Sequence, residues 1–86
     1  MAYRVIFEPT AQRQMKRLDR LPIYRRLRQR ILALADDPRP PGCRKLTGHP
    51  GWRIRVGDYR VVYEIDDVVR LVAIERVQHR DSVYDP

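Results

Sequence analysis

The chain has 86 residues, which suffices for one compact domain (residues 1–86) and is too short for two. Eighteen Lys and Arg residues against eleven Asp and Glu give a net charge of +7, so we expect a polyanion as the partner. No apolar run approaches the roughly 20 residues of a membrane span, no signal-peptide pattern opens the chain, and the single Cys43 cannot form an internal disulfide. These features predict a cytoplasmic protein without a membrane partner.

The first half of the sequence predicts one strand and two helices. Residues 2–7 are rich in β-branched and aromatic types and predict a strand. A first helix begins at Pro9 and is interrupted at Pro22, and a second ends at residues 36–38. The apolar positions at helical spacing are Ala11, Met15 and Leu18 in the first helix and Tyr24, Leu27, Ile31 and Leu34 in the second. We expect the two helices to form a hairpin.

The second half predicts a loop followed by three strands. Residues 38–51 hold four of the seven prolines and three of the four glycines, which is typical of a loop. Strands are expected at about 52–56, 59–65 and 68–77, and the last is apolar on both faces, as a central strand would be. The sequence therefore predicts a small α+β domain: an N-terminal strand, a two-helix hairpin, then a three-stranded antiparallel sheet with both helices on one face.

Strict alternation in residues 52–56 predicts a basic face on this sheet. Gly57-Asp58 is typical of a two-residue type II′ turn, and it sets a register in which Arg55 lies opposite Arg60, and Trp52 opposite Tyr63. The face away from the helices then gathers Arg53, Arg55 and Arg60. Like charges across a strand pair are destabilising, so an anionic ligand would explain the cluster. A merely solvated face is the alternative reading.

The segment after the last expected strand adds polar groups beside the basic face. His79, Arg80 and Tyr84 lie within this segment, and a strand end next to a cationic surface is a plausible site. No pair of acidic residues has the spacing of a metal site, so the sequence predicts neither a metal nor another cofactor.

Taken together, these patterns resemble the RelE branch of the RelE/ParE toxin superfamily, a class of type II toxin–antitoxin toxins, over essentially the whole chain. The motifs that carry the resemblance are Lys45-Leu46, Trp52-Arg53-Ile54-Arg55-Val56, Tyr59-Arg60-Val61-Val62-Tyr63 and His79-Arg80-Asp81-Ser82-Val83-Tyr84.

The resemblance implies a ribosome-dependent endoribonuclease that cuts messenger RNA in the decoding site and is neutralised by a RelB-like antitoxin. The functional positions it implies are Arg53, Arg55, Arg60, Arg80 and Tyr84, with Arg44 and Lys45 as further RNA-binding residues. Attack of a ribose 2′-hydroxyl on the adjacent phosphate needs a base and charge stabilisation. Arginine is a poor proton acceptor, so Tyr84 is the expected base, with His79 as the alternative, and no metal is required.

Two other functions remain open. A ParE-like toxin would share the fold but inhibit DNA gyrase, and such members generally lack the basic strand together with the terminal Arg and Tyr. A non-catalytic RNA- or DNA-binding module would carry aromatic side chains on its basic face to stack bases. Here Trp52, Tyr59 and Tyr63 are expected to point to the core instead.

Overall fold

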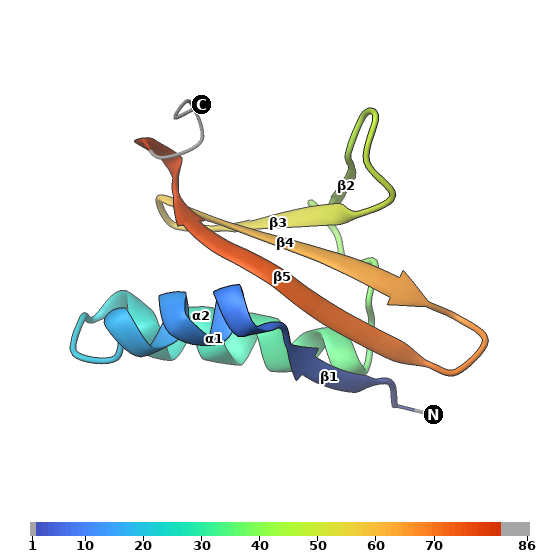
Figure 1. Ribbon diagram of the computed structural model, residues 1–86, viewed down its shortest axis with the longest axis horizontal. Helices are drawn as coiled ribbons and strands as arrows, with labels where there is room; N and C mark the ends of the chain where they lie inside the picture. Colours follow the sequence, from blue (N-terminus) through green and yellow to red (C-terminus); the bar gives the residue numbers. More distant parts are fainter. Residues whose placement is uncertain (1, 82–86) are drawn as a thin grey trace.

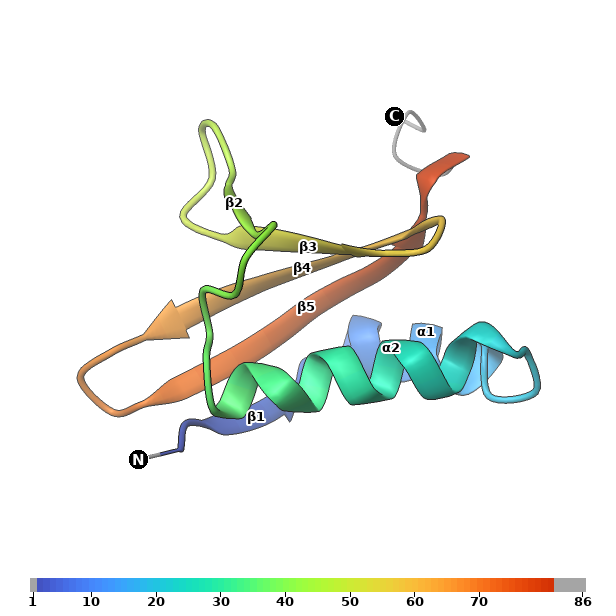
Figure 2. The same cartoon turned by 180° about the vertical axis from the view of Figure 1, so that it is seen from behind.

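A computed structural model describes residues 2–81 and shows a sheet covered on one face by two helices (Figures 1 and 2). The elements in chain order are β1 (Arg4–Phe7), α1 (Pro9–Arg17), α2 (Ile23–Leu32), a short 3-10 turn η1 (Ala33–Ala35), β2 (Arg44–Lys45), β3 (Trp52–Val56), β4 (Tyr59–Asp66) and β5 (Leu71–His79). The strand order is β1-β5-β4-β3-β2; β1 runs parallel to β5 and the other neighbours are antiparallel. Within the described residues, no helix lies on the opposite face of the sheet.

The predicted α+β class and helix hairpin are confirmed, but the sheet is larger than expected. The N-terminal strand β1 joins it beside β5, and the unpredicted β2 adds the opposite edge, where Arg44 pairs with Arg53. The expected start of the last strand at residue 68 is wrong. The Asp66 carboxylate accepts the backbone N–H groups of Val68 and Val69 at 3.0 and 3.1 Å, which turns the chain before β5 begins.

The apolar stripes of both helices form the core with the inner face of the sheet. Ala11 and Met15 of α1 and Leu27 and Ile31 of α2 are buried, as their helical spacing predicted. The buried residues of the sheet are Ile54, Val56, Val61, Val62, Tyr63, Val72, Ile74 and Val77. Neither helix, nor any other within residues 2–81, is long and apolar enough to cross a membrane.

The β3–β4 hairpin has the predicted register. Arg55 lies opposite Arg60, and Trp52 lies opposite Tyr63. Gly57 has φ +58° and Asp58 does not have a positive φ, which is the pattern of a type II′ turn. A Cβ atom at Gly57 would also lie 3.1 Å from Cδ1 of Ile23, so the hairpin end packs closely on α2. The turn therefore needs glycine for both its conformation and its contact.

A bulge in β5 changes which residues face the helices. Val62 pairs with Arg76 and the next residue, Tyr63, pairs with Ile74, so Glu75 is an extra residue in the ladder. Because of this extra residue, Ile74 and Val77 are both buried against the helices although they are three positions apart. Below the bulge, Oε1 of Gln14 in α1 accepts the backbone N–H of Val77 at 2.6 Å. This hydrogen bond ties α1 to the part of β5 that leads to the C-terminal motif.

A second tie holds the loop after η1 against the β4–β5 turn. Both guanidinium η-nitrogens of Arg39 bind the Asp67 carboxylate, at 3.2 and 2.9 Å, and the Tyr3 hydroxyl donates to it at 2.6 Å. These donors lower the pKa of Asp67 to about 2, with the Arg39 hydrogen bond as the main cause. The Arg39 guanidinium also lies 5.1 Å from the centre of the Trp52 ring, so the tie reaches β3.

Replacing Gln14 should remove the hydrogen bond between α1 and the bulged part of β5 and lower the stability of the fold. Gln14→Leu leaves the partly buried N–H of Val77 without its acceptor, and we expect the free energy of unfolding to fall by about 1–3 kcal/mol. Urea denaturation checks this, with Gln29→Leu on the exposed side of α2 as the matched control. Equal effects of the two substitutions would contradict a specific role for the hydrogen bond.

Candidate nucleic-acid interface

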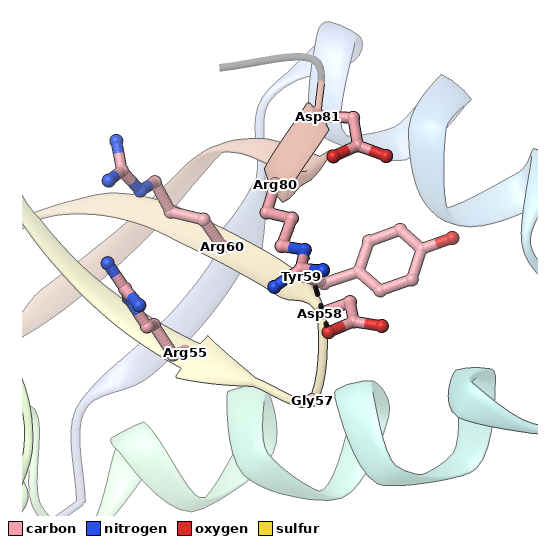
Figure 3. Close-up of a pocket in the computed structure, with 7 residues that line it drawn as sticks. All are labelled: Arg55, Gly57, Asp58, Tyr59, Arg60, Arg80 and Asp81. Carbon is pink, nitrogen blue, oxygen red and sulfur yellow. Dashed lines mark ion pairs between the residues drawn. The ribbon is translucent and has the colours of Figure 1, made fainter. Parts of the chain in front are cut away.

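The face of the sheet opposite the helices carries a cluster of arginines, here called the arginine face. Cross-strand pairing places Arg44 beside Arg53, and Arg55 beside Arg60, on the side opposite the buried Ile54 and Val56. Arg76, opposite Val62 on β4, adds a fifth guanidinium. The arginine face therefore consists of Arg44, Arg53, Arg55, Arg60 and Arg76. Figure 3 shows Arg55 and Arg60 extending together away from the helices.

The arginines of this face lie close enough to repel one another. The pKa of Arg53 is lowered, first by burial and then by the positive charges of Arg55, Arg44 and Arg60. Val62 lies next to Arg53 on the same face and is only 8% exposed, so this part of the face is partly desolvated. Partial burial strengthens the repulsion, and a bound polyanion would relieve it.

A cleft at the turn end of the β3–β4 hairpin continues the arginine face. Its volume is about 380 Å³, and it is lined by Arg55, Gly57, Asp58, Tyr59, Arg60, Arg80 and Asp81 (Figure 3). Arg80 reaches the cleft because its backbone N–H donates to the Asp58 carbonyl at 2.8 Å. The structure thus brings Arg80 from the C-terminal motif to the predicted pair Arg55 and Arg60.

Two predicted site residues lie on the other side of the sheet. His79 pairs with Tyr59, and the two rings meet edge to face at 5.1 Å on the helix-covered side. Its Nδ1 accepts the backbone N–H of Asp81 at 3.2 Å. Lys45 pairs with Trp52, its Nζ lies 5.5 Å from that ring, and it donates to the Pro50 carbonyl at 2.8 Å. Neither lines the cleft, and the predicted base Tyr84 lies outside the described residues.

A hydrogen-bonded cluster on the face away from the helices was missed by the sequence analysis. His49, Glu64 and Glu75 bring their ligand atoms within 4.8 Å of one another, with His49 Nε2 at 3.4 Å from Glu75. Burial, then the Glu64 hydrogen bond and charge, raise the pKa of Glu75 to about 7. Only the bulge, which adds Glu75 to this face, and the folding back of the 46–51 loop create this proximity.

The hydrogen bond at Nδ1 of His49 disfavours a metal at this cluster. Its Nδ1 accepts the backbone N–H of Gly51 at 2.8 Å, which leaves the ring proton on Nε2, facing Glu75. A metal at Nε2 would require the proton to move to Nδ1, where it would oppose the Gly51 N–H. The geometry therefore favours hydrogen bonding within the cluster.

The aromatic residues of the hairpin do not offer a stacking surface on the arginine face. Tyr63 is fully buried, and Trp52 and Tyr59 pack against the core from the helix-covered side, as the sequence predicted. Among residues 2–81, the groups on the arginine face are suited to binding phosphates. Guanidinium groups can hold a phosphate in bidentate geometry and stabilise added negative charge, but they do not accept protons.

Comparison with known proteins finds toxins of one superfamily. The family described as the ParE toxin of type II toxin–antitoxin systems (parDE) matches residues 5–84. The toxin–antitoxin complex RelBE2 of Mycobacterium tuberculosis contains a chain with 30% identity and a TM-score of 0.78, and the match covers 93% of this chain and 100% of that chain. No curated protein sequence gives a significant match.

Two further solved structures give similar matches. A chain of the archaeal RelE–RelB complex from Pyrococcus horikoshii shows 28% identity and a TM-score of 0.80, over 93% of this chain and 97% of that chain. A doubly substituted form of the E. coli toxin RelE, solved in the free state, shows 25% identity and a TM-score of 0.77, over 95% of this chain and 87% of that chain.

Removing one charge from the arginine face should stabilise the fold. For Arg53→Gln we expect the free energy of unfolding to rise by roughly 0.2–1 kcal/mol at low salt, because the repulsion from Arg44, Arg55 and Arg60 is lost. The gain should shrink at high salt, which screens that repulsion. Denaturation at two ionic strengths measures it, with Arg25→Gln on α2 as the control; a destabilised Arg53→Gln protein would contradict the expectation.

The pKa of Glu75 predicts a pH-dependent stability. Because its carboxyl has a folded pKa of about 7, above the value of 4.5 in an unconstrained chain, stability should decrease as pH rises from about 4.5 through 7. Glu75→Gln should flatten this decrease and be more stable than the wild type near pH 8. Thermal melts across this range test it, with Asp19→Asn in the exposed turn after α1 as the control. An unchanged slope would disprove it.

Proposed function

The chain belongs to the ParE toxin family within the RelE/ParE superfamily of type II toxin–antitoxin systems, and from this membership we propose that it cleaves messenger RNA at the ribosome. The observation that carries the proposal is the convergence of Arg55, Arg60 and Arg80 on one cleft that continues the arginine face. An RNA-cleaving toxin needs a phosphate-binding cleft whose cationic groups stabilise the negative charge of the transition state, whereas a gyrase inhibitor does not.

In the proposed reaction the ribose 2′-oxygen attacks the adjacent phosphorus and the bond to the 5′-oxygen breaks. Arg53, Arg55 and Arg60 bind the phosphate and stabilise the charge that develops on its oxygens. Arg80, across the cleft, stabilises the leaving 5′-oxygen, which takes a proton from water to give a 5′-hydroxyl and leaves a 2′,3′-cyclic phosphate. Tyr84 takes the proton of the 2′-hydroxyl; it is preferred over His79 because the latter faces the helix-covered side of the sheet. The reaction needs no metal.

The proposed partners follow from the relatives. Solved relatives from Mycobacterium tuberculosis and Pyrococcus horikoshii are toxin–antitoxin complexes, RelBE2 and RelE–RelB, so we propose a RelB-like antitoxin that neutralises this chain. The ribosomal decoding site and its messenger RNA would be the target, which places the action in the cytoplasm. Gyrase inhibition remains a second candidate because the matching family is described by its ParE members.

Cleavage in a purified translation system, with gyrase supercoiling assayed in parallel, tests the proposal. We expect ribosome-dependent cleavage that falls by about 100-fold in Arg60→Ala, through lost charge stabilisation, and in Tyr84→Phe, through loss of the base. Arg25→Ala, which removes an equal charge from the exposed side of α2, is the matched control. Intact RNA with blocked supercoiling would establish the gyrase function instead, and inactivity in both assays would favour a binding module.

A further inference from the structure

Asp58 places a negative charge in a cleft that also holds three arginines and a second carboxylate, that of Asp81. It is the second residue of the turn between β3 and β4, and it lines the cleft with Arg55, Arg60 and Arg80. A carboxylate here repels an anionic ligand, so its presence calls for a reason. Figure 3 shows the Asp58 side chain directed toward Arg80.

The turn itself does not require an aspartate at this position. The demanding position is Gly57, whose φ is +58°, whereas Asp58 has an ordinary negative φ. Within residues 2–81, the Asp58 carboxylate accepts no hydrogen bond from the turn backbone, unlike those of Asp37 and Asp66, which bind backbone N–H groups of the following residues. The local conformation would therefore accommodate other residues at position 58.

What Asp58 does contact is Arg80, at two points. Its carbonyl accepts the Arg80 backbone N–H at 2.8 Å, and its Oδ1 lies 3.9 Å from Nε of the same residue. The backbone bond fixes where Arg80 leaves β5, and the carboxylate lies close enough to attract its guanidinium. Arg80 would otherwise have many rotamers, because its side chain is 74% exposed.

The contact is made at Nε of Arg80 and not at its terminal nitrogens. Pairing at Nε leaves the two terminal nitrogens, which carry four of the five N–H donors and have no hydrogen-bond partner among the described residues. The guanidinium can therefore hold a phosphate oxygen while it stays paired with Asp58. A pair through the terminal nitrogens would have blocked that role.

We propose that Asp58 is a positioning residue that directs the Arg80 guanidinium toward the phosphate bound by Arg55 and Arg60. The inference rests on the proposed function, since it assigns a role within the same cleft. Asp58 does not touch the reacting atoms; it acts through Arg80. An exposed ion pair contributes little to folding stability, so the effect of losing it should be on function.

Four variants separate positioning from other roles: Asp58→Asn, Asp58→Glu, Arg80→Ala and the Asp58→Asn/Arg80→Ala double variant. We expect Asp58→Asn to lower the maximal cleavage rate about tenfold, through a misdirected Arg80, without raising the half-saturating ribosome concentration. Asp58→Glu should recover part of the rate. With Arg80 already removed, Asp58→Asn should have no further effect, and Asp19→Asn should match the wild type throughout.

A spectroscopic measurement tests the contact without relying on cleavage. The Nε–Hε signal of Arg80 in ¹⁵N NMR spectra, identified by its loss in Arg80→Ala, should move toward that of a free arginine side chain in Asp58→Asn. An unmoved signal, or an equal loss of rate with and without Arg80, would overturn the proposal. If the wild type cleaves no RNA, the proposed function fails, and the Arg80 signal still decides whether Asp58 directs that side chain.

Discussion

The register of the β3–β4 hairpin is the constraint on which both faces of this protein depend. Side chains alternate along a strand, so a slip of one residue would place Arg53 and Arg55 in the core and Ile54 in solvent. The register is set at Gly57, whose positive φ closes a two-residue turn and whose lack of a side chain allows contact with Ile23. One glycine thereby separates an apolar face that packs on the helices from a cationic face that points away from them.

The arginine face could be predicted because its origin is local. Alternation in residues 52–56 and the Gly57-Asp58 turn fixed the pairing of Arg55 with Arg60, and the structure has that pairing. The buried faces of the two helices could be predicted equally well from apolar periodicity. Ala11, Met15, Leu27 and Ile31 are buried at the expected spacing. Short-range patterns of this kind require no knowledge of the rest of the chain.

Most of the missed features depend on contacts with another segment of the chain. The two-residue strand β2 is stabilised by pairing with β3 and not by its own composition, and the parallel β1–β5 pairing joins residues far apart in sequence. The side of the sheet on which Lys45 lies follows from the β2–β3 pairing, and that of His79 follows from the β4–β5 pairing. The bulge did leave a signal, because Ile74 and Val77 are both apolar at a spacing that no regular strand buries on one face.

The parallel pairing of β1 with β5 also determines when the sheet can be completed during synthesis. β1 is an edge strand whose partner is β5, so its ladder closes a loop that spans most of the chain. Closing such a loop is entropically unfavourable, and folds rich in such contacts form slowly. While β5 is still inside the ribosome, the inner face of α1 lacks the strand that covers most of it. The sheet can therefore be completed only after residues 71–79 have emerged, so folding ends after translation of β5 rather than alongside it.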